Sequence, residues 1–111
     1  MACTVERRAD AAIVHACDQV DIANAAELRE AFIDVFSERP PAHLIVDLAA
    51  VSFIDSTGIG VVVGAHRRTT AAGGRFTVVV ATPHVRKVLQ ITGLLRAWRV
   101  VASVEDALED V

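Results

Sequence analysis

The chain has 111 residues, which fits one domain, so we expect residues 1–111 to fold as a single domain. Hydrophobic residues make up 53% and charged residues 23%, a balance that supplies a core and excludes an intrinsically disordered chain. The net charge of -3 argues against direct binding of nucleic acid, which requires a basic surface. Neither a run of about 18 apolar residues nor an apolar signal core is present, so we expect a cytoplasmic protein without membrane contact.

Short apolar segments alternate with amphipathic ones along the chain. Strands are predicted at residues 4–6, 11–16, 44–48, 75–80 and 98–101. Helices are predicted from Asp21 to the Pro40-Pro41 pair, from Ser56 to Ala71, from Thr82 to Gly93 and from Ser103 onward. The first two strands form a hairpin that turns at Ala9-Asp10, and the later strands are separated by helical crossovers, which makes them parallel. The fold class is therefore α/β, with a mixed, mostly parallel sheet of about four to five strands and about four helices.

Local residue choices support several helix ends. Thr82 is expected to be an N-cap with Pro83 in the first helical position, and Ser103 is expected to cap the last helix. The pair Gly73-Gly74 is expected to stop the helix that begins at Ser56.

The aromatic residues and one histidine are assigned to packing. The four phenylalanines, Phe32, Phe36, Phe53 and Phe76, are expected in the core, and Trp98 is expected to pack near the sheet edge. His66 lies on the apolar face of its helix and is expected to pack there.

The segment from Asp55 to Gly60 carries the functional signal. It places the hydroxyls of Ser56 and Thr57 between a strand and a helix, and two glycines follow in the first helical turns. Glycine there costs about 1 kcal/mol relative to alanine, so close approach of another backbone or of a partner is the expected reason. A helix N-terminus tolerates an anion, and a phosphate on Ser56 would add a charge of about -1.5 to -2 beside Asp55. A purely structural reading, with N-capping by Asp55 or Ser56 and glycines that serve helix–sheet packing, explains the same spacing.

This segment, Asp-Ser-Thr-Gly-Ile-Gly, resembles the Asp-Ser-Ser/Thr-Gly-aliphatic-Gly motif of the anti-sigma factor antagonists, a family of bacterial STAS domains. The resemblance covers about residues 11–110 and continues at matching spacing through four further stretches. These stretches are Gly73-Gly74, Thr82-Pro83, residues 91–94 and residues 103–108. The chain departs from the family where Gly-Glu-aliphatic-Asp is usual, because Asp18 and Gln19 replace the glycine and the glutamate while Asp21 is kept.

The resemblance implies a phosphoswitch. The unphosphorylated antagonist would bind an anti-sigma factor that is itself a Ser/Thr kinase, release a sigma factor for transcription, and lose binding when Ser56 is phosphorylated. A Ser/Thr phosphatase would reset the switch. The implied partner-binding residues are Asp21, Ile22, Asn24, Asp55, Thr57, Gly58, Ile59, Gly60, Thr82, Pro83 and His84. The chain itself would not be an enzyme, and we expect no catalytic residue, cofactor or metal.

Other readings remain open at this point. The domain can act as a constitutive STAS scaffold in a signalling or transport complex, with Ser56 never modified. A nucleotide-binding protein is disfavoured because the third glycine, Gly64, comes one position late for G-x-G-x-x-G and no Gly-Lys-Ser/Thr is present. A hydrolase is disfavoured because G-x-S-x-G is missing. Cys3 and Cys17 are symmetric about Asp10, so a redox-sensitive disulfide across the hairpin is a further hypothesis.

Overall fold

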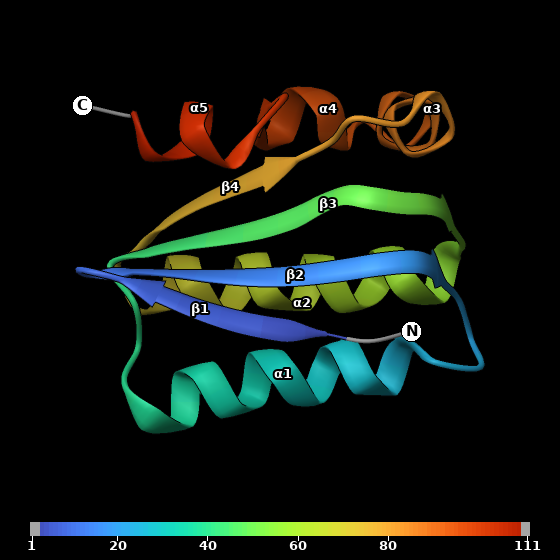
Figure 1. The fold of residues 1–111 in the computed structure, drawn as a ribbon. Helices are drawn as coiled ribbons and strands as arrows, with labels where there is room; N and C mark the ends of the chain where they lie inside the picture. The colour runs from blue at the N-terminus through green and yellow to red at the C-terminus, as the bar shows by residue number, and fades with distance from the viewer. Residues whose placement is uncertain (1–2, 110–111) are drawn as a thin grey trace.

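The computed structural model describes residues 3–109, which form a five-stranded sheet with helices on both faces (Figure 1). The strands are β1 (Thr4–Arg8), β2 (Ala11–Val20), β3 (His43–Ile54), β4 (Arg75–Val79) and β5 (Arg99–Val101). They lie in the order β1-β2-β3-β4-β5, in which β1 runs antiparallel to β2 and the others are parallel. The predicted mixed sheet with one antiparallel hairpin edge is confirmed.

Residues 3–109 contain five helices, four of them between strands and the last after β5. They are α1 (Ala25–Glu38), α2 (Ser56–Ala71), α3 (Pro83–Ile91), α4 (Leu94–Ala97) and α5 (Val104–Leu108). The sequence pattern predicted α2 correctly, but α4 was missed because a single turn carries no periodicity. None of the helices within residues 3–109 is long and apolar enough to cross a membrane.

Helix α1 begins four residues later than predicted. The carbonyl oxygen of Asp21 accepts hydrogen bonds from the amides of Asn24 and Ala25, so residues 21–24 form a turn before the helix. Hydrophobic periodicity could not reveal this turn, because the residue that carries the pattern first, Ala25, lies beyond it.

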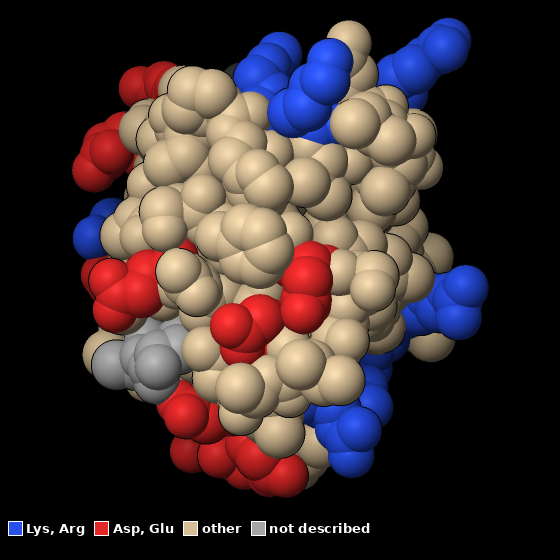
Figure 2. All heavy atoms as spheres, turned by 90° about the vertical axis from the view of Figure 1, so that its right-hand side faces the viewer, with Lys and Arg blue, Asp and Glu red and all other residues tan. Residues whose placement is uncertain are grey.

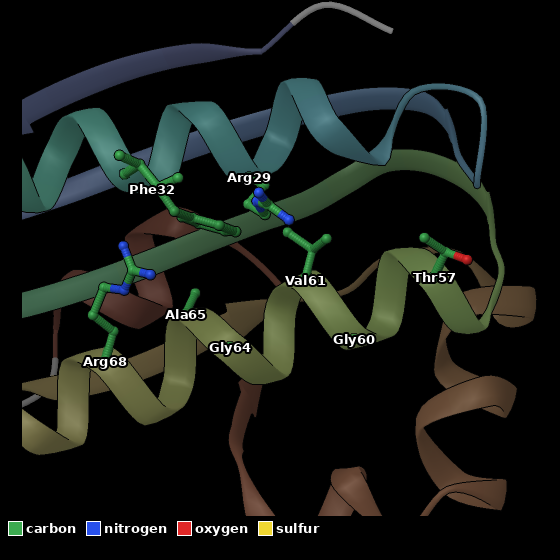
Figure 3. Close-up of a pocket in the computed structure, with 9 residues that line it drawn as sticks. Arg29, Phe32, Thr57, Gly60, Val61, Gly64, Ala65 and Arg68 are labelled. Atoms are coloured by element: carbon green, nitrogen blue, oxygen red, sulfur yellow. The ribbon is translucent and has the colours of Figure 1, made fainter.

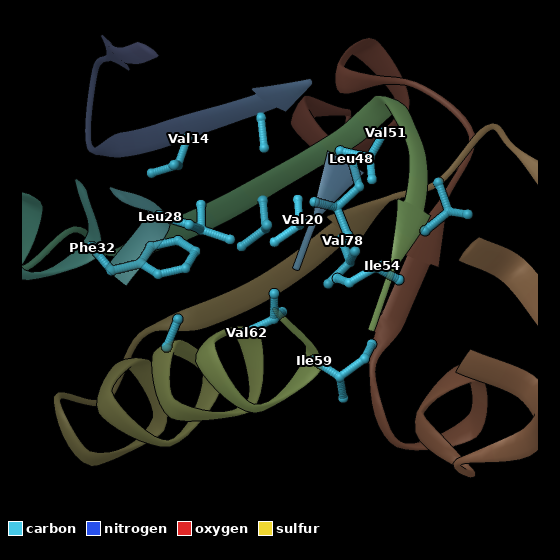
Figure 4. Close-up of a cluster of buried hydrophobic side chains, with 14 of the residues drawn as sticks. Val14, Val20, Leu28, Phe32, Leu48, Val51, Ile54, Ile59, Val62 and Val78 are labelled. Carbon is cyan, nitrogen blue, oxygen red and sulfur yellow. The ribbon is translucent and has the colours of Figure 1, made fainter. Parts of the chain in front are cut away.

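The sheet divides the core into two apolar clusters. Residues Val14, Leu48 and Val78 face α1 and α2, together with Leu28, Phe32 and Val62 from those helices (Figure 4). Their strand neighbours Ile13, Ile45 and Val79 point to the other face and pack against α5. Since alternate residues of a strand point to opposite faces, β2 and β3 are apolar on both sides, which explains the continuous apolar run at residues 44–48.

The predicted caps are borne out at one helix and altered at another. The amide of Asp106 donates to Oγ of Ser103, 3.1 Å away, as expected for an N-cap. Thr82 occupies the N-cap position of α3, but its hydroxyl donates to the carbonyl oxygen of Val51 at 2.7 Å and makes no capping bond. The prediction that the Thr82 side chain caps α3 is therefore wrong. Its hydroxyl links the start of α3 to β3, because the Val51 carbonyl oxygen lies within hydrogen-bond distance.

The hairpin turns at Ala9-Asp10 as predicted, but its register does not support the disulfide hypothesis. Thr4 pairs with His15 and Arg8 pairs with Ala11. A hairpin symmetric about Asp10 would instead pair Thr4 with Ala16, so the observed register differs from it by one residue. No disulfide joins Cys3 and Cys17. Continuing the ladder places Cys3 opposite residue 16 and not residue 17, and neighbouring residues of a strand point to opposite faces.

A polar network crosses the first three strands on the face that α5 only partly covers. The Nδ1 of His15 lies 2.7 Å from Oδ2 of Asp47, and its Nε2 lies 3.1 Å from Oε1 of Glu6. Burial acts to lower the pKa of His15, but the hydrogen bonds to Glu6 and Asp47 outweigh it, so the pKa is raised. The hydrogen bonds from His15 and Arg8 lower the pKa of Glu6. Only the protonated imidazole can donate to both carboxylates at once.

We expect the stability of the domain to fall as pH rises from about 6.5 through the raised pKa of His15. In that window the native state holds a proton that the unfolded chain has lost, so raising the pH favours unfolding. Urea unfolding of the wild type between pH 6 and 8 should show this slope, and most of the slope should be lost in His15→Gln. An equal slope in both proteins would rule out His15 as its source.

Candidate functional site

The side chain of Asp55 caps the start of α2. Strand β3 ends at Ile54, and Asp55 caps the helix by accepting a hydrogen bond from the Gly58 amide at Oδ1, 2.9 Å away. Ser56 is the first residue of the helix, and its side chain and that of Thr57 are exposed. The predicted hydroxyl pair therefore stands at the positive end of a 16-residue helix, in contact with solvent.

The same carboxylate fixes the loop between β2 and α1. Oδ2 of Asp55 accepts a hydrogen bond from the Ile22 amide at 3.0 Å, and the Asp55 amide donates to the Val20 carbonyl at 3.1 Å. The side chain of Ile22 is 79% exposed. Asp55 thus ties the loop that carries Ile22 to the start of α2. The exposed Ile22 side chain contributes no hydrophobic stabilisation to the isolated domain.

Two other predicted residues shape this loop from inside. Asn24 Oδ1 accepts from the Asp21 amide at 2.9 Å, and its Nδ2 donates to the Gln19 carbonyl at 2.9 Å. Asp21 Oδ1 accepts from the Ala23 amide at 3.0 Å. The polar groups of Asp21 and Asn24 are therefore engaged within the loop, and Ile22 is the residue of the three that projects from it.

The structure corrects the expectation that Gly58 and Ile59 are contact surface. A Cβ on Gly58 would lie 2.8 Å from side-chain atoms of Ile54 and Val20 and 2.9 Å from the Val20 carbonyl oxygen. Ile59 is 8% exposed and belongs to the core. Both residues support the surface from beneath, because the first turn of α2 is pressed against the ends of β2 and β3. Gly60 differs, since it is exposed and nothing lies within 4 Å of its missing Cβ.

The loop before α3 adds an aromatic pair beside this helix. His84 is exposed and stacks on Phe53, with ring centroids 4.9 Å apart and an interplanar angle of 18°. Pro83 is the first residue of α3 and is exposed, whereas Thr82 is half-buried and bound to β3. Of the three residues predicted here, Pro83 and His84 are thus presented to solvent.

Phe53 belongs to this surface, although the sequence pattern assigned it to the core. It is 40% exposed, whereas Phe32 is buried and Phe36 and Phe76 are half-buried. The reason is a bulge: Asp18 pairs with Val51 but Gln19 pairs with Phe53, so β3 has an extra residue and the alternation shifts. His66 and Trp98 pack as predicted, with Trp98 buried and His66 4.9 Å from the ring of Phe76.

The bulge also accounts for the residue at which the chain departs from the family pattern. Asp18 has a φ of 64°, in the left-handed region that glycine adopts at little cost. Aspartate is among the few other residues that tolerate this conformation. The usual glycine is therefore explained by backbone geometry, and Asp18 keeps the geometry while adding a carboxylate next to the loop of Ile22.

Figure 2 views this end of the molecule, where uncharged atoms dominate, acidic side chains lie near the centre and most basic side chains lie toward the periphery. Ser56, Thr57, Ile22, Phe53 and His84 are its exposed uncharged or aromatic members, and we call them the α2-end surface. Such a surface, with exposed apolar groups on an otherwise charged domain, is typical of a protein-binding site.

We expect Asp55→Ala to lower the free energy of unfolding by about 1–2 kcal/mol, because it removes the cap of α2. It also releases the Ile22 amide, so the loop should exchange amide hydrogens faster. Urea unfolding together with hydrogen exchange at Ile22 checks both effects. Asp55→Asn is the matched control, since asparagine caps helices comparably, and a loss as large as that of alanine would contradict the capping role.

Comparison with known proteins agrees with this architecture. The anti-sigma-F factor antagonist RsfB of Mycobacterium tuberculosis is 29% identical over 108 residues, which cover 97% of this chain and 87% of RsfB. The crystal structure of an anti-sigma factor antagonist from Mycobacterium paratuberculosis superposes with a TM-score of 0.88 at 27% identity, covering 96% of this chain and 90% of that one. The phosphorylated form of the Bacillus cell fate determinant SpoIIAA shares the fold, with a TM-score of 0.75 at 24% identity and coverage of 97% of each chain.

A family model supports the same assignment over nearly the whole length. The model described as the STAS domain matches residues 2–107. The match spans all five strands and the site at the start of α2. The chain belongs to the STAS domain family.

Proposed function

We propose that this protein is an anti-sigma factor antagonist whose binding is switched by phosphorylation of Ser56. In its unphosphorylated form it binds an anti-sigma factor through the α2-end surface and so frees a sigma factor. The two mycobacterial relatives named above are described as anti-sigma factor antagonists, and they match this chain over almost its full length. The protein acts as substrate and binding partner in the cytoplasm and catalyses nothing itself.

The observation that carries the proposal is the position of Ser56. Ser56 is exposed and is the first residue of a capped helix. A kinase can therefore reach its hydroxyl, and the helix dipole can accommodate the phosphate. Both carboxylate oxygens of Asp55 already accept backbone hydrogen bonds, so a phosphate on Ser56 adds negative charge beside a fixed carboxylate. A partner packed on Ile22 and Thr57 would then meet a bulky dianion, while the fold stays intact.

The arrangement of glycines disfavours a nucleotide-binding function. Gly58, Gly60 and Gly64 all lie within α2 and not in a loop that precedes it. A phosphate-binding loop needs glycines in the turn before the helix, where their amides point at the phosphate. Gly58 is also closed off by Val20 and Ile54.

The test is phosphorylation by the partner. The protein is incubated with ATP and each anti-sigma kinase encoded in the same genome, and its intact mass is measured. We expect one phosphate on the wild type and none on Ser56→Ala, with a Ser/Thr phosphatase reversing the change. If partners bind without modifying Ser56, and Ser56→Asp binds as well as wild type, the protein is a constitutive scaffold and the switch is refuted.

A further inference from the structure

A groove lies between α1 and α2, and residues of both helices line it. Its volume is about 260 Å³, and its apolar lining comes from Phe32, Ile33, Val61 and Ala65. Figure 3 shows Phe32 on α1 opposite Val61 and Ala65 on α2. Thr57 lies at one end, immediately after Ser56 in the first turn of α2 (Figure 3). The groove is therefore continuous with the surface that the proposed phosphoswitch controls.

The helix that forms one wall is weakened where it faces the groove. Gly60 and Gly64 lie one turn apart in α2, and each costs the helix about 1 kcal/mol relative to alanine. Nothing in the domain lies within 4 Å of a Cβ at either position. Gly58 is explained by close packing against β2 and β3, but these two glycines have no such reason inside the chain. Their effect is to let an external backbone approach α2 closely.

The charge of the groove indicates what approaches it. Arg29 reaches from α1 toward Val61, and Arg68 reaches from α2 toward Phe32 (Figure 3). Neither guanidinium has an ion-pair or hydrogen-bond partner among residues 3–109, and no carboxylate lines the groove. The protein as a whole carries a net charge of -3, so the groove is a local cationic site on an acidic molecule. Arginine favours bidentate contact with carboxylates.

We infer that the α1–α2 groove seats a helix of the anti-sigma partner that is apolar on one side and carries an Asp or Glu toward each arginine. This inference rests on the proposed function and extends its interface beyond the α2-end surface. From Thr57 to Arg68 the groove runs along α2 for about 16 Å at 1.5 Å per residue, which accommodates roughly three turns of a helix. A phosphate on Ser56 stands at its end and repels these carboxylates, so the groove strengthens the effect of the switch.

Binding of the anti-sigma factor to variants of the full chain tests the inference. Gly64→Leu fills the groove, and Arg29→Gln combined with Arg68→Gln removes its charge. We expect each protein to fold, as judged by circular dichroism and urea unfolding, and to bind at least about tenfold more weakly than wild type. The double variant should also show a shallower dependence of Kd on salt concentration. Arg67→Gln, on the same helix but outside the groove, is the matched control and should bind as wild type.

The outcomes separate this inference from the proposed function. If Ser56→Asp loses binding while the groove variants bind as wild type, the groove is not part of the interface and the phosphoswitch stands. If the groove variants lose binding while Ser56 is never modified and Ser56→Asp binds normally, the groove stands and the phosphoswitch fails. If no anti-sigma factor from the genome binds the wild type, both are overturned.

A photocrosslinker at position 64 identifies the occupant directly. The residue p-benzoylphenylalanine is placed there in the complex, and the crosslinked peptide is mapped by mass spectrometry. A helical segment of the anti-sigma factor that carries Asp or Glu supports the inference. Crosslinks to a second copy of this chain, or only to non-helical segments of the partner, overturn it.

Discussion

Ser56→Asp should weaken binding to the anti-sigma factor at least about tenfold, whereas Ser56→Ala should bind as wild type and resist phosphorylation. The aspartate places a fixed charge at the first position of α2, next to Asp55 and the exposed Thr57 in the chain, where Asp55 also binds the loop of the exposed Ile22. A partner that buries this surface would have to desolvate that charge without a counter-ion. Titration calorimetry with the purified partner measures the effect.

The control for Ser56→Asp is Ala42→Asp, which adds the same charge at an exposed position just before β3. It should leave Kd unchanged, because it lies at the other end of β3 from the α2-end surface and outside the α1–α2 groove. Unfolding of Ser56→Asp should require as much urea as wild type, since acidic residues stabilise the first turn of a helix. Equal loss of binding in both variants would assign the effect to net charge and not to the site.

Gly58→Ala should lower the free energy of unfolding by about 1–3 kcal/mol, whereas Gly60→Ala should raise it by about 1 kcal/mol. The substitutions are chemically identical and two residues apart, but their surroundings differ. A methyl group at position 58 meets the Val20 carbonyl oxygen at 2.9 Å and two side chains at 2.8 Å, so α2 must move away from the sheet. At position 60 the methyl group meets nothing within 4 Å and only improves helix propensity.

Urea unfolding of the two variants and the double variant checks this contrast. The double variant should fall between the single ones, because the two sites affect the helix in opposite directions. A stabilising effect of Gly58→Ala would show that α2 can shift from β2 and β3 without cost. A destabilising effect of Gly60→Ala would mean that this glycine serves the fold and not a partner.

Local sequence determined the order of elements and the location of Ser56. The bounds of α2, the hairpin turn at Ala9-Asp10 and the Ser103 cap depend on neighbouring residues, so periodicity and capping rules predicted them. The role proposed for Ser56 comes from the family motif, because spacing alone left open a cap and a phosphorylation site.

Tertiary structure decided which residues around Ser56 are available to a partner. Phe53 points outward because a bulge in the β2–β3 pairing shifts the alternation, and no residue preference in β3 signals that shift. Gly58 and Ile59 are inaccessible because the start of α2 is pressed against two strands. Each outcome depends on contact between segments 33 to 38 residues apart, as in Asp18–Val51 and Val20–Gly58, which a pattern read along one segment does not contain.

The same distinction applies to the charged groups. The sequence determined that this is an α/β domain with a hydroxyl at a helix start, since helix and strand periods and capping preferences act over a few residues. It did not place His15 between Glu6 and Asp47, or Arg29 and Arg68 along one groove. Those neighbours come from different strands and helices, so strand register and helix packing alone bring their charges together.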